Sequence, residues 1–333
     1  MPGAAIDIHT HIVPGDIPAY AGRHDPARWP QMAAASDCHH KQVMIAGKNF
    51  RTVSDECWDA ARRIEAMDRM GIGCQVLSPM PELLSYWFPA ADGLAFARHV
   101  NDTIGAMVAR GASRFAGLGM VPLQDPDLAT RELENLMRDG FRGVEIGSNV
   151  NGAIIGDPKF EPFFAAAEKL GAAIFVHALH PSGIDRIVGP PRLPALLAFP
   201  CETSFAISSL ITGGTLQKHP DLRLCFSHGG GVFALILPRL LAGLEMMAGL
   251  KQQVTAEPRA IARRLYYDTL VYDAKTLKFL IEIFGATQLC IGTDYPFEIH
   301  EKEPLRDIAA LGLGAKEIGD LHAGNARRFL GLA

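Results

Sequence analysis

A chain of 333 residues with 48% hydrophobic and 20% charged residues can bury a large core, and its net charge of −4 gives no strongly basic surface. The lysines and arginines form no long block, which argues against nucleic acid or an anionic membrane as a partner. The six cysteines are scattered without a Cys-x-x-Cys pair, a usage typical of reduced thiols in a cytosolic protein rather than of a disulfide framework.

The start of the chain points to the same compartment. No basic and apolar leader precedes the first predicted strand. We find no apolar run of the roughly 18–20 residues that a helix needs to span a bilayer. We therefore expect a cytoplasmic protein without a membrane partner.

The first predicted strand, residues 6–11, reads Ile-Asp-Ile-His-Thr-His. Side chains alternate between the two faces of a strand, so His9 and His11 are expected on one face. Two imidazoles placed in this way can bind a divalent cation together. A pair standing alone would more often be two half-exposed strand histidines. Whether this pair is part of a metal site therefore depends on the rest of the chain.

Residues 12–53 show no clear period and are rich in Pro, Gly, His and Asp. Loops of this length in compact domains are usually functional or locally structured. We predict a small insertion that passes over the mouth of the fold. It ends in Gly-Lys-Asn-Phe-Arg, which brings two cationic side chains, Lys48 and Arg51, back towards the body.

Beyond this insertion, predicted helices and strands alternate. The further strands are expected at residues 72–78, 115–121, 142–146, 172–176, 222–227, 265–269 and 287–291. The helices are expected at about 54–70, 92–110, 125–140, 157–171, 200–216, 232–247, 273–284, 303–311 and 316–330.

Eight strands separated by helices, several of them apolar throughout, predict a single (β/α)8 TIM barrel over residues 1–333. A doubly wound open sheet is the alternative. It is disfavoured because no Gly-x-Gly-x-x-Gly follows the first strand.

Further polar side chains stand where predicted strands end. His177 and His228 close the fifth and sixth strands, and Asp294 follows the eighth. The carboxyl ends of barrel strands meet at one mouth, so these groups are expected near His9 and His11. Three imidazoles and a carboxylate suit zinc or a similar divalent metal, and the remaining histidine would act as general acid or base. Spacing alone leaves open whether His177 or His228 is the one that does not bind metal.

Taken together, these motifs resemble the amidohydrolase superfamily, and within it the branch that contains 2-amino-3-carboxymuconate 6-semialdehyde decarboxylase. The His-x-His pair and the closing Asp294 are shared across the superfamily. More specific to the branch are Gly-Lys-Asn-Phe-Arg at residues 47–51 and the three glycines after His228. Val-Pro-Leu-Gln-Asp at residues 121–125 and Gly-Thr-Asp-Tyr-Pro-Phe at residues 292–297 extend the resemblance over nearly the whole chain.

The resemblance implies an amidohydrolase-type barrel with one zinc ion. The ligands that it implies are His9, His11, His177 and Asp294, with His228 acting on the metal-bound water. It further implies that Arg51 and Arg239 bind substrate carboxylates, and that Arg239 reaches in from the other subunit of a homodimer. Lys48, in the same motif as Arg51, is the third candidate substrate-binding cation. A position eight residues beyond Gly231 lies about 12 Å along a helix, which agrees with a site in the neighbouring subunit.

Two departures limit the resemblance. Many superfamily hydrolases carry a carbamylated lysine at the end of the fourth strand, whereas residues 143–147 here read Gly-Val-Glu-Ile-Gly, which favours a single metal. The loop after His177 also differs, so the substrate does not carry over. His180 in that loop is a further pocket candidate.

The reaction that we expect is nonoxidative decarboxylation of a small unsaturated or aromatic carboxylic acid. Metal-dependent hydrolysis or hydration of a related lactone, amide or ring-cleavage product is the alternative, because it would use the same metal ligands. A metal-stabilised binding protein is the weakest of the three. Arg51 and Arg239 favour decarboxylation, since they would bind carboxylate groups.

Overall fold

Eight parallel strands form the barrel that the alternating pattern predicts. The computed structural model describes residues 4–111, 113–190 and 192–332. In sheet order the strands are β1 (Ala5–Ile12), β5 (Ile72–Pro79), β6 (Phe115–Gly119), β7 (Gly143–Gly147), β10 (Ala173–His177), β11 (Arg223–Phe226), β12 (Tyr266–Asp268) and β13 (Leu289–Cys290). The barrel closes where the Ile8 N–H donates to the Ile291 carbonyl at 2.8 Å and Thr10 pairs with Tyr295.

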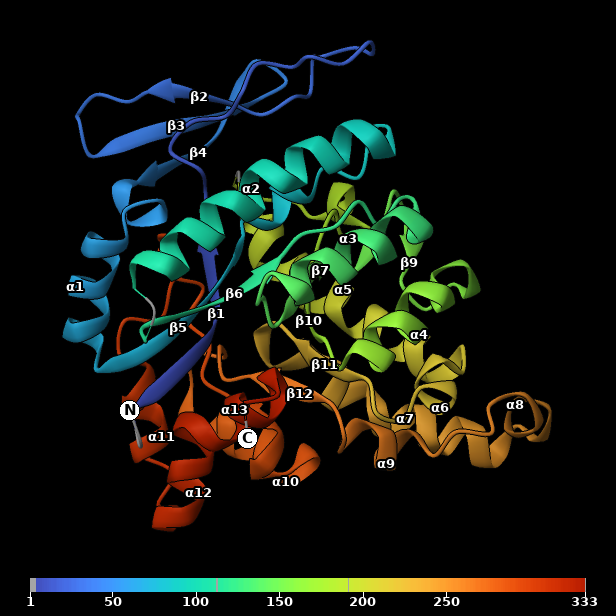
Figure 1. Ribbon diagram of the computed structural model, residues 1–333. Helices are drawn as coiled ribbons and strands as arrows, with labels where there is room; N and C mark the ends of the chain where they lie inside the picture. Colours follow the sequence, from blue (N-terminus) through green and yellow to red (C-terminus); the bar gives the residue numbers. More distant parts are fainter. Residues whose placement is uncertain (1–3, 112, 191, 333) are drawn as a thin grey trace.

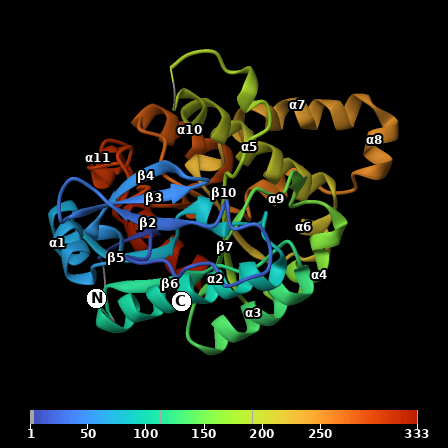
Figure 2. The same cartoon turned by 90° about the horizontal axis from the view of Figure 1, so that it is seen from above.

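Helices surround this barrel (Figures 1 and 2). They are α1 (Ala60–Met70), α2 (Ala90–Arg110), α3 (Pro126–Arg138), α4 (Glu161–Leu170), α5 (Leu193–Thr212), α6 (Thr215–Lys218), α7 (Phe233–Met246), α8 (Ala248–Gln253), α9 (Pro258–Ala262), α10 (Ala274–Phe284), α11 (Pro304–Ala309), α12 (Ala315–Gly319) and α13 (Asn325–Leu330).

The first of these helices begins later than the sequence predicts. Asp59 caps α1, because its carboxylate accepts from the backbone N–H groups of Ala61 and Arg62. A short 3₁₀ helix, Asp55–Cys57, does follow Ser54, but Ser54 makes no side-chain cap and is the last residue of a strand.

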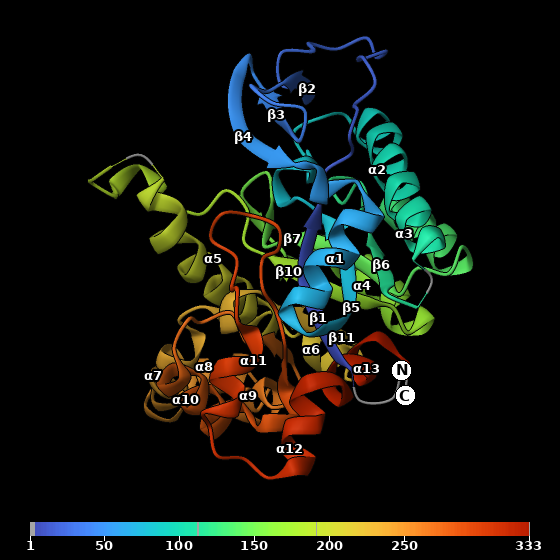
Figure 3. The same ribbon diagram turned by 90° about the vertical axis from the view of Figure 1, so that its left-hand side faces the viewer.

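The insertion after β1 contains a three-stranded antiparallel sheet, formed by β2 (Gln31–Ala34), β3 (His40–Ile45) and β4 (Lys48–Ser54). Few residues of these strands are buried, so the strands lack the apolar pattern from which strands are recognised. Figures 1 and 3 show the sheet above the carboxyl end of β1. The insertion therefore lies at the end of the barrel where the strands have their carboxyl ends, and Phe50 and Arg51 from it line the cavity there.

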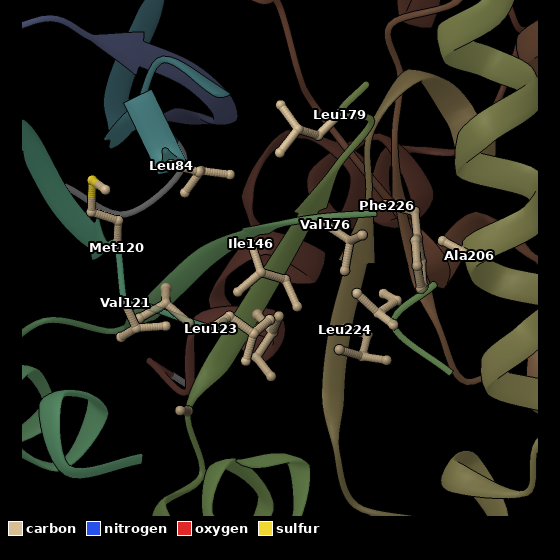
Figure 4. Close-up of a cluster of buried hydrophobic side chains, with 14 of the residues drawn as sticks. Leu84, Met120, Val121, Leu123, Ile146, Val176, Leu179, Ala206, Leu224 and Phe226 are labelled. Carbon is tan, nitrogen blue, oxygen red and sulfur yellow. The ribbon is translucent and has the colours of Figure 1, made fainter. Parts of the chain in front are cut away.

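The hydrophobic core has two parts. Outward-facing side chains such as Ile146, Val176 and Phe226 pack between the strands and the helices, where Ala206 of α5 meets Phe226 (Figure 4). A smaller cluster that includes Phe175 fills the barrel and contacts α13. Most strand residues are apolar because both faces of the strands are buried.

An irregularity in β1 decides where its side chains point. Asp7 pairs with Gln75, but Thr10 pairs with Leu77, so β1 has one more residue than β5 over this stretch. A bulge of this kind redirects side chains. Asp7 contacts Gln75 on the outer side, whereas the ring of His9 lies against Phe175 inside the barrel, with 4.8 Å between ring centroids.

Two helical stretches correct the sequence-based expectation that no apolar run is long enough to span a bilayer. Ala195–Thr212 and His228–Met246 are long and apolar enough by length and composition, each with a mean hydropathy of 1.4. Both belong to the layer around the barrel, where 44% and 33% of their residues are buried. Core helices of soluble proteins pass the same test, so this is weak evidence for a membrane partner.

Candidate metal centre

Four side chains at the mouth of the barrel form a candidate metal site. His9, His11, His177 and Asp294 each offer one ligand atom, and these atoms lie within 4.8 Å of one another. All four residues are buried. Nε2 of His11 lies 3.1 Å from Nε2 of His9 and 3.0 Å from Asp294 Oδ1. This donor set and its spacing fit a divalent cation.

The other ring nitrogen of each histidine already has an oxygen partner. Nδ1 of His9 lies 2.6 Å from Asp268 Oδ2. Nδ1 of His11 lies 3.0 Å from the Pro79 carbonyl, and Nδ1 of His177 lies 2.8 Å from the Ala178 carbonyl. These acceptors assign the proton to Nδ1 and leave the Nε2 lone pair for a metal.

Burial and charge set the protonation states of the cluster. Burial lowers the pKa of His11 to about 4 and that of His177 well below its usual value, so both are neutral at pH 7. Burial also opposes charge on His9, but the hydrogen bond and charge of Asp268 outweigh it and raise the His9 pKa to about 9. A divalent cation at this position would therefore replace a proton on His9.

Asp294 completes the set as the carboxylate. Burial opposes its ionisation, but the hydrogen bond with His11 and the nearby imidazoles outweigh burial and hold the Asp294 pKa well below its usual value. Its backbone has φ of 65°, a conformation that non-glycine residues seldom adopt. Such strain is typical of functional sites.

Glu145 occupies β7, the strand in which many superfamily hydrolases carry their lysine. Its Oε2 accepts from the Ser78 hydroxyl at 2.5 Å and lies 3.7 Å from Nδ1 of His11. Burial raises the Glu145 pKa to about 8, so the carboxyl group is mostly protonated at neutral pH. This arrangement agrees with one metal rather than two.

A cavity of about 540 Å³ opens above the cluster. His177, His228 and Asp294 line it together with Arg51. Most of the remaining wall is apolar and includes Phe50, Met80, Pro81, Leu179, Leu196, Phe199, Leu270, Val271, Phe297 and Ile299. An apolar cavity with a few convergent polar groups is the usual form of a small-molecule site.

His228 lies beside the four ligands but outside their set. Its ring centroid is 5.1 Å from that of His177 and 5.4 Å from that of His9. Its buried Nδ1 has no hydrogen-bond partner within the described ranges. Burial, and then the charge of His9, lowers the His228 pKa, so the ring is neutral at pH 7 and can accept a proton.

The backbone after His228 needs its glycines. Gly231 has φ of 63°, and a Cβ there would lie 1.8 Å from the Pro200 carbonyl oxygen. The close approach of the chain to α5 therefore excludes a side chain.

The three candidate substrate-binding cations are placed differently. The Arg51 guanidinium lines the cavity and lies 4.0 Å above the Phe297 ring centroid. Lys48 is exposed where β3 turns into β4 and does not line the cavity of its own chain. Arg239 is exposed on α7 and also does not line this cavity.

Sequence reasoning missed Asp268, the partner of His9. Asp268 ends β12, so the rule that identified His177 and His228 from the ends of their strands could have found it. It also missed Glu82, which lines the cavity from a short turn between β5 and α2. His180, the further pocket candidate, does not line this cavity; it lies in a neighbouring pocket and contacts Glu82.

Comparisons with known proteins agree with this geometry. The sequence profile of a family described as Amidohydrolase matches residues 6–332. The chain is 38% identical to 2-amino-3-carboxymuconate-6-semialdehyde decarboxylase of Dictyostelium discoideum, over 98% of this chain and 91% of the relative.

Solved structures extend the comparison. The structure of 5-carboxyvanillate decarboxylase from Sphingomonas paucimobilis superposes with a TM-score of 0.75 at 28% identity, over 82% of this chain and 83% of that one. A 5-carboxyvanillate decarboxylase from Novosphingobium aromaticivorans, complexed with manganese, shares the fold with a TM-score of 0.71 at 24% identity, over 84% and 82% of the two chains.

Proposed function

This chain belongs to the amidohydrolase family, and from that membership we propose that it is a metal-dependent decarboxylase of a small unsaturated or aromatic carboxylic acid. One observation carries the proposal: four buried ligand atoms lie within 4.8 Å of one another at a cavity that also contains an arginine. The enzyme would be a carboxy-lyase that releases carbon dioxide without oxidation.

The substrate that we propose resembles 2-amino-3-carboxymuconate 6-semialdehyde. The 38% identical relative is named for that substrate, and it aligns with 98% of this chain. A cavity of about 540 Å³ has the size of a small-molecule site. The loop after His177 departs from the pattern that we expect for this branch, so a related acid, such as a hydroxybenzoate, belongs in the same test.

The metal that we propose is one zinc ion per chain, held by His9, His11, His177 and Asp294. Imidazole nitrogens and a carboxylate oxygen are common ligands of catalytic zinc. Manganese in the Novosphingobium enzyme makes it the first alternative. A divalent metal bound here would supply a Lewis acid and lower the pKa of water.

The residues around the metal would divide the remaining work. Decarboxylation replaces a carbon–carbon bond by a carbon–hydrogen bond, so a proton must reach the carbon that loses carbon dioxide. His228 lines the cavity as a neutral base that would take a proton from water, leaving hydroxide, and deliver that proton to the carbon as carbon dioxide leaves. Asp268 would hold the imidazole of His9 and the backbone of His228 in a fixed relation.

Arg51 would bind a carboxylate of the substrate. Its guanidinium lines the cavity and lies over the face of the Phe297 ring. The N–H groups at the edge of the guanidinium therefore remain available to a substrate carboxylate. A paired carboxylate would fix which bond breaks, because orientation accounts for much of the rate of such a reaction.

Arg239 would enter the cavity of a second copy of the chain, as in a homodimer. It is exposed on α7, and no hydrogen bond or ion pair involves it within the described part of the chain. Leu235 and Met246 on the same helix are 69% and 83% exposed, and Leu196, Leu197 and Phe205 of α5 are each 52% exposed. Apolar surface of this kind is typical of an interface between subunits.

We propose cytoplasmic localisation, without a nucleic-acid or membrane partner. The six free cysteines support this proposal, because free thiols persist in a reducing compartment.

Carbon dioxide release tests the proposed reaction. Purified protein loaded with zinc or manganese should release carbon dioxide from at least one acid in a panel of muconate semialdehydes, hydroxybenzoates and lactones. His228→Ala should retain its metal but lose turnover. An active substrate whose carboxylates remain intact would contradict the proposal and favour a hydrolase or hydratase.

A further inference from the structure

One carboxylate interrupts the apolar wall of the cavity. Glu82 lies in a short 3₁₀ turn, Pro81–Leu84. Met80 before the turn and Leu83 and Leu84 within it are buried and apolar. Its own side chain is 15% exposed and lines the cavity that contains His177, His228 and Asp294. Burying a carboxylate in apolar surroundings costs free energy unless the carboxylate has hydrogen-bond or ionic partners.

The observed partner of Glu82 is His180. Nε2 of His180 lies 3.0 Å from one carboxylate oxygen of Glu82 and 3.2 Å from the other. The His180 ring packs beside Trp87 with 5.6 Å between centroids, and its backbone φ is 41°. His180 lines the neighbouring pocket, so it holds Glu82 from outside the cavity.

This contact leaves acceptor capacity unused. An ionised carboxylate offers about four lone-pair positions, and a single imidazole N–H supplies one donor. Within residues 4–111, 113–190 and 192–332, no second side chain or backbone group hydrogen-bonds to the Glu82 carboxylate. Arg51, the cation of the same cavity, lies over Phe297 and forms no ion pair with Glu82 among these residues. Among the described residues, the cavity therefore contains an arginine and a glutamate that form no ion pair with each other.

We propose that Glu82, positioned by His180, determines substrate specificity by accepting a hydrogen bond from an amino or hydroxyl group of the substrate. The preferred acid carries a carboxylate for Arg51 and a hydrogen-bond donor for Glu82. This rests on the proposed function, because it names the second polar group of the substrate. An acid with a methyl or methoxy group at that position leaves the carboxylate desolvated and unpaired, which a site of this type rejects.

Matched pairs of acids test the proposal by binding. Titration calorimetry of metal-loaded protein would compare the 2-, 3- and 4-hydroxybenzoates with the methoxybenzoates, and the aminobenzoates with the methylbenzoates. Wild-type protein should bind the donor-bearing acid about tenfold or more tightly in at least one pair. Glu82→Leu should bring the ratio of the two affinities in that pair close to one. Glu134→Leu, on the exposed surface of α3, should leave this affinity ratio unchanged. A wild-type affinity ratio near one in every pair would overturn the proposal. So would a high affinity ratio that persists in Glu82→Leu.

The positioning role of His180 has its own test. His180→Leu removes the N–H that holds Glu82, whereas His180→Gln keeps a donor. We expect His180→Leu to raise KM severalfold for donor-bearing acids while kcat stays near its wild-type value, and His180→Gln to restore KM. Equal losses in both variants would contradict positioning through Glu82.

Binding and turnover separate this inference from the proposed function. An affinity ratio that falls to about one in Glu82→Leu, with no carbon dioxide released from any acid, would support the inference and contradict decarboxylation. Carbon dioxide release with a ratio that Glu82→Leu leaves unchanged would support decarboxylation and contradict the inference.

Discussion

Asp268 Oδ2 lies 2.6 Å from Nδ1 of His9, and the same buried carboxylate accepts the backbone N–H groups of His228 and Gly229 at 2.9 and 2.8 Å. One side chain therefore fixes both a candidate metal ligand and the candidate acid–base residue. Outer carboxylates of this kind orient the imidazole and increase its basicity towards a metal.

Asp268→Asn should weaken metal binding about 10- to 100-fold, because the neutral amide cannot hold the His9 tautomer in the same way. Competition with a chromogenic chelator would measure the change. Asp102→Asn, an exposed position on α2, is the matched control. Equal metal affinity in Asp268→Asn and wild-type protein would exclude this role.

The four-residue cluster should bind about one metal ion per chain, by analogy with catalytic zinc sites. Elemental analysis of protein prepared without chelator would show this, and the combined substitution His9→Ala with His11→Ala should abolish binding. Metal at 100 times its Kd should stabilise the folded state by about 2.7 kcal/mol, measured as a shift of the denaturation midpoint. Unchanged metal content in the double variant would place the metal elsewhere.

Arg51→Ala should raise KM about 10- to 100-fold with a smaller effect on kcat, since it removes a charge-assisted hydrogen bond to a substrate carboxylate. Steady-state kinetics on the active acid would measure both constants. Lys48→Ala on the same strand is the matched comparison, and its exposed position predicts a smaller change in KM. Similar increases in KM in the two variants would support Lys48 as a substrate-binding residue.

Mixing two inactive proteins should restore activity if Arg239 crosses between subunits. A hybrid dimer of Arg239→Ala and His228→Ala chains contains one site with both residues intact. Activity should return to a fraction of the wild-type value after subunit exchange, which native mass spectrometry would verify. Exchange without recovery would argue against a shared site.

Arg63→Met should destabilise the fold by at least about 3 kcal/mol, because it leaves buried polar groups without partners. The fully buried guanidinium donates to Gln75 Oε1 at 2.8 Å and to the carbonyls of His11 at 3.0 Å and Tyr295 at 3.3 Å. It thus joins the two segments that carry His11 and Asp294. Denaturant unfolding would measure the loss, with exposed Arg62→Met as control; equal midpoints in the two variants would contradict it.

The fold could be read from the sequence because its signals are local. Most barrel strands are short, largely apolar runs between helix caps and glycines, and a strand buried on both faces can be recognised without knowing its partner. The same local rule placed His9, His11, His177, His228 and Asp294 at strand ends, where a barrel gathers its functional groups. The sheet within residues 12–53 gave no such signal, because few residues of its strands are buried.

What the sequence by itself determined was therefore the barrel and the set of polar groups at its mouth, since both follow from short-range patterns. Tertiary structure alone decided the relations among those groups. The bulge in β1 turns His9 inward, Asp268 meets His9 across 259 residues, and His180 meets Glu82 across 98. It also separates His177, inside the ligand cluster, from His228 beside it, a choice that spacing left open. These relations depend on strand register and on loops that meet only when the barrel closes, and neither is encoded in the residues next to each side chain.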